Sequence, residues 1–88
     1  MDWKLEPKPE PKPELKPRYD TEDGAWKLSV IYGGDGGSLV IADTQGVYIN
    51  VFLRGAMTLE ECCAATVEMR DTWIAGVAAM AERKISAP

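Results

Sequence analysis

The sequence predicts an α+β fold: a three-stranded antiparallel meander packed against a long C-terminal amphipathic helix, preceded by an extended proline-rich arm. Residues 4–17 alternate charged residues with Pro or Leu, which predicts an extended arm over residues 1–18. Residues 25–53 hold three short β-branched runs separated by turn residues, which predict the meander. Residues 59–84 carry apolar side chains at helical spacing, which predict the helix. The chain therefore divides into an arm, 1–18, and a small domain, 19–88.

The arm has a strict two-residue period between residues 4 and 17, with charge at even positions and Leu or Pro at odd ones. Proline fixes φ and lacks the backbone donor, which excludes a helix or a central strand. Trp3 and Tyr19 flank the arm, and Leu5 and Leu15 lie on its apolar side. Two interpretations stay open. The arm is either a docking strand that binds a partner through these four residues, or a soluble spacer.

The three strands are predicted at residues 25–32, 38–42 and 47–53, after a polar junction at residues 19–24. The first run alternates, which is typical of a strand with one buried face, and the second is a β-branched run. Residues 33–37 include four glycines, which allow the positive φ angles of a tight hairpin. A phosphate-binding loop is disfavoured there because no helix follows.

The third predicted strand is apolar on both faces. Val47, Ile49 and Val51 share one face with Leu53, whereas Tyr48 and Phe52 lie on the other. We therefore expect the second face of the sheet to be able to bind another apolar surface as well.

The helix is predicted to begin at a capping box in residues 58–61, Thr-Leu-Glu-Glu, and to continue to about Lys84. An unbroken helix would be about 39 Å long, whereas a seven-residue strand spans only ~24 Å. The helix must then overhang the sheet or break near Gly76. An apolar overhang needs a cover, and a second copy of the chain is the simplest one, so we expect a homodimer.

One side of the predicted helix is acidic. Glu61, Glu68 and Asp71 fall together at 100° per residue, on a domain with five Lys/Arg and ten Asp/Glu between residues 19 and 88. This excess of negative charge predicts a protein partner with a basic surface and disfavours direct nucleic-acid binding.

Arg70 falls on the apolar side of the helix, one turn from Trp73. An unpaired arginine there would be costly. Three interpretations stay open: a pair with a sheet carboxylate such as Asp43, a side chain that extends past Trp73 to solvent, or a contact with a partner, for which Arg and Trp are favoured residues.

Several function classes are disfavoured. The chain has no histidine, which excludes Ser/His and Cys/His catalysis and His-ligated metals. Cys62 and Cys63 are adjacent and lie on or beside the apolar stripe, so we expect them to pack as small hydrophobes. We expect no enzyme activity, no metal and no cofactor. No signal peptide or long apolar run is present, so we expect a cytoplasmic protein that does not enter a membrane.

The order of three strands and a capped helix, with the run Gly55-Ala56-Met57-Thr58-Leu59-Glu60-Glu61-Cys62, resembles HicB-like antitoxins over residues 28–85. Asp43 and Gly46 correspond to the turn before the third strand in that family, and Trp73 to its aromatic position. The proline-rich arm is foreign to the family pattern. The resemblance implies a protein that neutralises a partner without catalysis.

Together these observations predict a non-catalytic protein-binding module that inhibits or neutralises another protein, as an antitoxin or a phage-encoded inhibitor of host defence does. The predicted partner-binding residues are Trp3, Leu5, Leu15, Tyr19, Glu61, Glu68, Arg70, Asp71 and Trp73. The alternative is a structural or accessory component of a larger assembly, such as a virion, whose arm docks on a neighbouring subunit.

Overall fold

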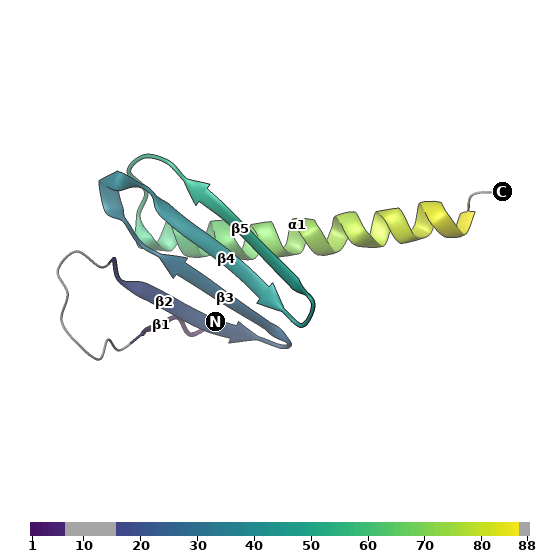
Figure 1. Ribbon diagram of the computed structural model, residues 1–88, viewed down its shortest axis with the longest axis horizontal. Helices are drawn as coiled ribbons and strands as arrows, with labels where there is room; N and C mark the ends of the chain where they lie inside the picture. Colours follow the sequence, from purple (N-terminus) through teal and green to yellow (C-terminus); the bar gives the residue numbers. More distant parts are fainter. Residues whose placement is uncertain (7–15, 87–88) are drawn as a thin grey trace.

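The computed structural model describes residues 1–6 and 16–86, with side-chain surroundings as far as Glu82. It shows a five-stranded antiparallel sheet in chain order, with one long helix packed on one face (Figure 1). The elements are β1 Lys4–Leu5, β2 Arg18–Asp23, β3 Trp26–Ile31, the 3₁₀ turn η1 Gly34–Gly36, β4 Ser38–Thr44, β5 Val47–Leu53 and α1 Leu59–Ser86. The predicted α+β class is confirmed, and β3, β4 and β5 are the predicted meander.

Strand β2 lies where the sequence predicts a polar junction. It pairs with β3 along its whole length, from Arg18 opposite Ile31 to Asp23 opposite Trp26. The missed signal was the Asp-Gly pair at residues 23–24, a strong hairpin indicator. Gly24 adopts a φ of 62° in this turn. The polar composition of β2 conceals a strand whose side chains on the helix side are Tyr19, Thr21 and Asp23.

The core lies between the sheet and the first half of α1. Leu28, Val30 and Val40 are almost fully buried on the face that α1 covers, and Cys62 meets them from the helix. Cys62 is a free thiol that packs as a small hydrophobe, as the sequence predicts. Its neighbour Cys63 is half-buried, and burial is the main cause that raises the pKa of its thiol. The helix packs chiefly on β3 and β4.

The helix begins as predicted. The Thr58 backbone N–H donates to Glu61 Oε1 at 2.8 Å, and the Glu61 N–H donates to Thr58 Oγ1 at 3.1 Å. It then continues through Gly76 without a break, so of the two possibilities the overhang is correct. The radius of gyration is 15.5 Å, against about 12 Å for a compact chain of this length. The projecting half of α1 therefore elongates the molecule (Figure 1).

The turn between β3 and β4 holds a glycine that no other residue can replace without strain. Gly37 has a φ of 92°. A Cβ there would lie 2.6 Å from the Phe52 ring and 2.9 Å from the Leu53 carbonyl oxygen. The close approach lets the Phe52 ring lie over the turn, next to the face of the sheet that α1 leaves open.

Candidate protein-interaction surfaces

The described ends of the arm are fastened to the sheet of the same chain. Lys4 and Leu5 pair with Asp20 and Tyr19 of β2. Trp3 packs against the core cluster and is half-buried, as is Tyr19. These two predicted partner-binding residues are thus engaged in the fold of their own chain.

The other two predicted arm residues differ from them. Leu5 is 57% exposed at the edge of the sheet and is available to a partner. Leu15 lies outside the described residues, so its role stays a prediction.

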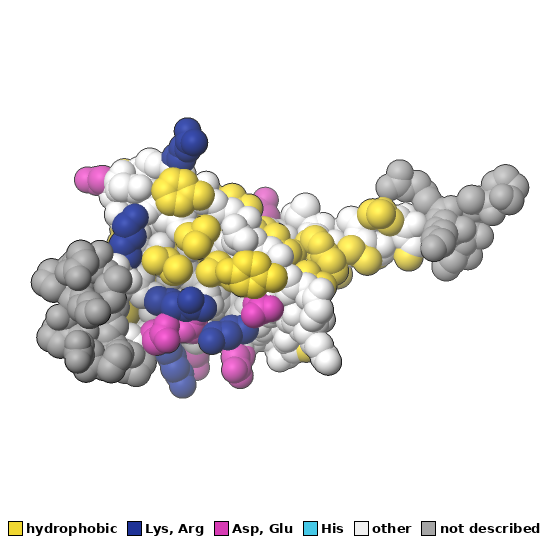
Figure 2. All heavy atoms as spheres, viewed as in Figure 1, with side chains coloured by type: hydrophobic (Ala, Val, Ile, Leu, Met, Phe, Trp, Pro, Cys, Tyr) yellow, Lys and Arg dark blue, Asp and Glu magenta, His cyan; other side chains and the backbone are white. Residues whose placement is uncertain are grey.

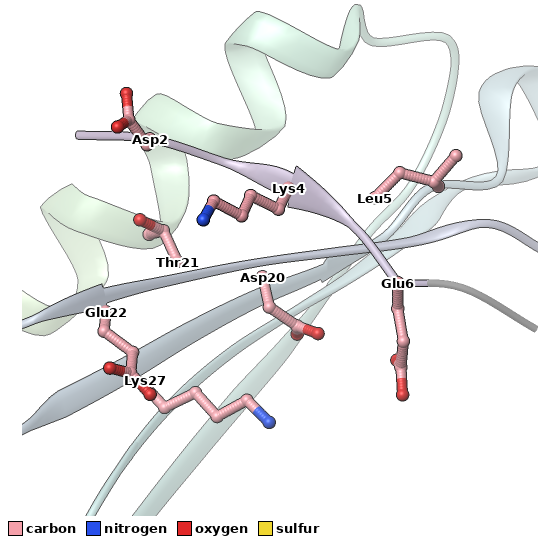
Figure 3. A pocket seen from close by; sticks show the side chains of 8 residues that line it. All are labelled: Asp2, Lys4, Leu5, Glu6, Asp20, Thr21, Glu22 and Lys27. Atoms are coloured by element: carbon pink, nitrogen blue, oxygen red, sulfur yellow. The ribbon is translucent and has the colours of Figure 1, made fainter.

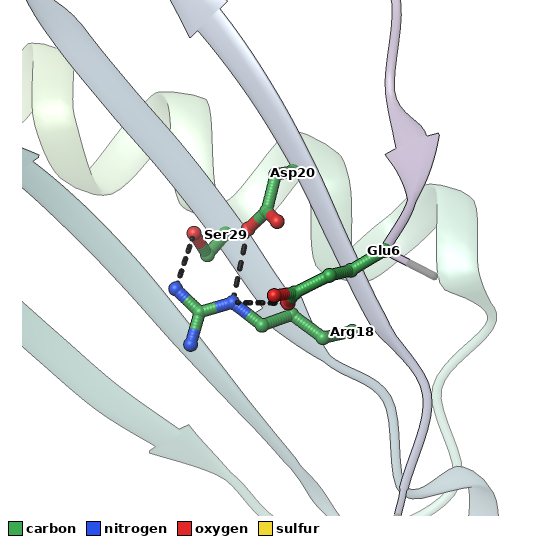
Figure 4. A network of polar contacts seen from close by, with 4 residues as sticks. All are labelled: Glu6, Arg18, Asp20 and Ser29. Atoms are coloured by element: carbon green, nitrogen blue, oxygen red, sulfur yellow. Dashed lines mark hydrogen bonds and ion pairs between the residues drawn. The ribbon is translucent and has the colours of Figure 1, made fainter. Parts of the chain in front are cut away.

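A polar network holds β1 against β2 (Figure 4). Arg18 Nε lies 3.0 Å from Asp20 Oδ1 and 3.3 Å from Glu6 Oε2, and Arg18 Nη2 donates to Ser29 Oγ at 3.2 Å. Burial raises the pKa of Asp20, but hydrogen bonds from Ser29 and Arg18 and the charges of Arg18 and Lys27 outweigh it, so that this pKa lies below its ordinary value. The network fixes the N-terminal segment on the β2 edge.

A hollow of about 670 Å³ lies along this edge. Its lining comes from the N-terminal segment, β1, β2 and β3: Asp2, Lys4, Leu5, Glu6, Asp20, Thr21, Glu22 and Lys27. Figure 3 shows that these side chains splay to both sides of the edge and do not converge on one point. Acid–base catalysis requires converging groups, and the side chains drawn around this hollow do not converge.

The predicted acidic face of α1 points to solvent, and its three carboxylates have different roles. Glu61 closes the capping box, and its hydrogen bonds with Thr58 lower its pKa. Asp71 accepts a hydrogen bond from Arg70 Nε at 2.8 Å. Glu68 is exposed and has no ion pair among the residues described. Of the three, Glu68 is therefore the carboxylate most available to a cationic partner.

A shallow depression of about 570 Å³ surrounds Glu68 on the outward side of α1. Small or short side chains and two carboxylates line it. The lining residues are Ala64, Val67, Glu68, Asp71, Thr72 and Ala75. Small residues let a partner approach the helix backbone closely, and the carboxylates favour a cationic group.

Arg70 pairs within its own chain. Only 8% of the residue is exposed, and its Nη1 lies 2.8 Å from Asp23 Oδ2. Of the three interpretations, the pair with a sheet carboxylate is confirmed. The carboxylate is not Asp43, because Asp43 extends from the opposite face of the sheet, whereas Asp23 lies on the helix side at the end of β2. Burial alone would lower the pKa of Arg70. The hydrogen bonds and charges of Asp23 and Asp71 outweigh burial, so this pKa lies above its ordinary value and the guanidinium stays charged.

Trp73 stands where α1 leaves the sheet. Its ring meets Trp26 edge-on, with centroids 5.8 Å apart and an interplanar angle of 69°. It remains 36% exposed, so part of the ring is available for a partner.

Beyond Trp73, the apolar side of α1 continues without a sheet below it. Ile74 and Val77 are each 43% exposed, and Met80 is 64% exposed. In Figure 1 this second half of the helix, which we call the overhang (residues 73–82), projects past β5. The predicted length of the helix and its apolar stripe predict this surface, and Trp73 is one of the predicted partner-binding residues.

The face of the sheet opposite α1 has no covering element among the described residues. Figure 2 looks onto this open face, where apolar side chains gather in the middle and charged ones border them. Phe52 is 53% exposed and Tyr48 62% exposed, and the half-buried Leu39 lies opposite Phe52 in the register. The two-residue alternation of residues 47–53 predicts that this face carries apolar side chains.

Among the described residues, no group of three or more His, Cys, Asp or Glu side chains is placed to hold a metal ion. No helix in the described part of the chain is long and apolar enough to cross a bilayer.

Comparison of the chain with protein-family models, with curated proteins and with solved structures gives no match. The similarity to HicB-like antitoxins therefore rests on the sequence features alone.

Proposed function

We propose that this chain is a non-catalytic protein-binding module that inhibits or neutralises another protein with a basic surface. The observation that supports it best is the acidic depression on the outward side of α1, where Glu68 is exposed and the lining includes Ala64 and Ala75. The net negative charge of the domain steers a cationic partner toward this side. The setting we propose is antitoxin-like, or that of a phage-encoded inhibitor in the host cytoplasm.

A lysine or arginine of the partner is the group that fits the depression. It would meet Glu68 directly, while Asp71 keeps its bond to Arg70. A rim charge of this kind acts mainly on the association rate and on the salt dependence of binding. Capture should therefore weaken as the ionic strength rises.

The test is capture of partners from the native host by the tagged chain, with three variants. Glu68→Lys reverses the charge in the depression, and Glu68→Gln removes it while keeping the shape. Glu22→Lys is the matched control, since it makes the same reversal at an exposed position on β2. We expect a basic protein that the wild type and the control retain and that Glu68→Lys loses. Equal retention by all variants would contradict the proposal.

Inhibition is then tested on the captured protein itself. Its activity is measured with increasing amounts of wild-type chain and of the Glu68→Lys variant. We expect wild type alone to suppress the activity. A partner that binds through Glu68 but keeps full activity would contradict inhibition and leave an accessory role.

The alternative function, a component of an assembly such as a virion, depends on the arm. Deleting residues 1–17 would remove Trp3 from the core as well, so it does not separate the two functions. Replacing residues 7–15 with a Gly/Ser segment of equal length keeps Trp3 and β1. Loss of assembly with inhibition retained would support the alternative.

We also propose that the chain forms a homodimer. The support is the overhang, whose side chains at Ile74, Val77 and Met80 are exposed without a role in the fold of one chain.

A further inference from the structure

We propose that β5 pairs with β5 of a second copy, antiparallel across a two-fold axis at Asn50, so that the two sheets join into one. This inference rests on the proposed self-association and not on the capture of a foreign protein. It specifies which surfaces of the chain meet, in which register, and why the assembly stops at two copies.

The first argument is the exposed edge itself. Within the described part of the chain, strand β5 is the last in the sheet and pairs on one side only, with β4. Its sequence, Val-Tyr-Ile-Asn-Val-Phe-Leu, has seven residues and contains no charge, proline or glycine. Monomeric proteins protect an edge of this kind with charges, prolines, bulges or a very short strand. None of these devices is present on β5, which makes it a template for another strand.

The second argument is the symmetry of that sequence. About Asn50 the strand is a palindrome of chemical type: Ile49 mirrors Val51, Tyr48 mirrors Phe52, and two aliphatic residues close the ends. A two-fold axis at Asn50 therefore places Tyr48 opposite Phe52 of the second copy, twice. Cross-strand aromatic pairs are among the most favourable. A foreign strand would need a matching sequence, whereas a second copy has it already.

The axis also gives Asn50 a role. Its amide faces the same amide of the second copy, and each can donate to and accept from the other. Asn50 is exposed in the single chain. A polar residue at one position of an apolar interface is an established way of specifying register.

The third argument is the overhang, which projects past the same edge (Figure 1). On the helix side of β5, Val47 and Ile49 are half-buried and Val51 is 43% exposed. A groove of about 310 Å³ runs there between β5 and α1, lined by Val51, Leu53 and Met69 among others. A two-fold axis perpendicular to the sheet directs each overhang toward this uncovered side of the other copy.

The exposed area is sufficient for a stable dimer. Seven large apolar side chains of β5 and the overhang are at least one-third exposed: Tyr48, Val51, Phe52, Trp73, Ile74, Val77 and Met80. With ~150–250 Å² for a whole aromatic side chain and roughly 60–120 Å² for an aliphatic one, their exposed part is on the order of 500 Å² per chain. A standard interface buries about 800 Å² per partner, a little more than half of it apolar.

The opposite edge of the sheet explains closure. Strand β1 has only two residues, Lys4 and Leu5, and one of them is charged. Short and charged edges resist pairing. Joining through β5 alone is isologous, so it produces a closed pair and not a fibre.

The test uses the full chain in size-exclusion chromatography with light scattering, over a range of concentrations. Asn50→Lys places two like charges on the axis, and the control Ala64→Lys adds the same charge on the outward side of α1. We expect wild type and control to have the mass of a dimer, and Asn50→Lys to raise the dissociation constant by on the order of tenfold or more. Met80→Lys should also raise the dissociation constant of the dimer. If it leaves this constant unchanged, the overhang is not part of the interface.

A second variant gives a positive signal even if Asn50→Lys folds poorly. Residues directly opposite in antiparallel strands have Cα atoms about 4.5–5.5 Å apart, within the range that a disulfide bridges. Asn50→Cys should therefore cross-link into a dimer on mild oxidation, whereas Glu22→Cys, exposed on β2, should not. Cys62 is buried and Cys63 half-buried, so the wild type serves as the background. A monomeric wild type, or equal cross-linking of the two variants, would overturn the proposal.

Discussion

In the ion pair between Arg70 and Asp23, we expect replacement of the two residues to change the free energy of unfolding by different amounts. The Arg70 side chain is only 10% exposed, whereas that of Asp23 is 46% exposed. Removing Asp23 leaves a buried charge with fewer partners, and removing Arg70 leaves two carboxylates that water can reach. We therefore expect Asp23→Ala to destabilise the chain more than Arg70→Met does.

The magnitudes follow from these exposures. A hydrogen bond to a charged group contributes about 1.5–3 kcal/mol, and the lower end applies here because Asp23 is half-exposed and Arg70 keeps its 2.8 Å contact with Asp71. Asp23→Ala should therefore cost about 1.5 kcal/mol. Arg70→Met keeps an apolar stem of similar length in the core and should cost less than about 1 kcal/mol.

The assay is urea unfolding at pH 7, followed by tryptophan fluorescence, with linear extrapolation of the free energy of unfolding. Trp73 packs on Trp26 where α1 leaves the sheet, so the signal reports on undocking of the helix. Asp71→Ala is the comparison at the more exposed of the two carboxylates that contact Arg70, 60% exposed against 46% for Asp23, with an expected cost of about 0.5 kcal/mol. If Arg70→Met proves as costly as Asp23→Ala or more so, the inequality argued from exposure is refuted.

Three further predictions concern the cap, the acid side of the stability curve and a turn. Thr58→Ala removes the capping box and should cost about 1 kcal/mol in urea unfolding. The pKa of Asp20 is lowered in the folded state, so its contribution is present above its ordinary pKa and is lost as the pH falls through the lowered one. Asp20→Asn should thus melt below wild type at pH 7, with a gap that closes on acidification. Gly37→Ala should cost more than Gly46→Ala by calorimetry, because both have positive φ but only the former meets the Phe52 ring.

Each of these has an outcome that would contradict it. Unchanged stability of Thr58→Ala would mean that the bonds at the helix start contribute nothing net. A melting-temperature gap for Asp20→Asn that is constant or grows toward low pH would reverse the sign of its linkage. Equal costs for the two glycine variants would mean that the turn moves away from the ring.

The elements that the sequence predicts well are those with strong local signals. β5 has the predicted boundaries, residues 47–53, because its alternation and both flanking turns agree. The helix start at Leu59 is likewise specified by its capping box. Strand β2 was missed because its residues are mostly polar and have low strand propensity, so that its only local signal is the Asp-Gly turn that joins it to β3.

The length of the predicted helix does not determine whether α1 breaks at Gly76. Glycine in a helix interior costs about 1 kcal/mol relative to alanine, which is small against the many backbone hydrogen bonds on either side of it. At Gly76 an added Cβ would meet open space, so no close packing explains the residue.

The sequence predicts the candidate surface on the helix better than it predicts the contacts of Arg70, Trp3 and Tyr19. The acidic side of α1 follows from helical period alone and is where the sequence places it. The partner of Arg70 depends on which face of the sheet each carboxylate occupies, and that requires knowing that β2 exists. The predicted docking role of Trp3 and Tyr19 depends in the same way on β1 pairing with β2, which no local pattern reveals.

The strand order has a consequence for how the chain folds. Every pairing joins strands that follow one another along the chain, so the sheet can grow by successive hairpins. Such short sequence separations keep the entropy of loop closure low and favour rapid folding for a β-rich domain. The contacts of α1 with β3 and β4 close the largest loops, and we expect helix docking to set the rate. In a kinetic experiment, substitutions at Cys62 or Thr66 should then change the folding rate more than substitutions in the β4–β5 turn.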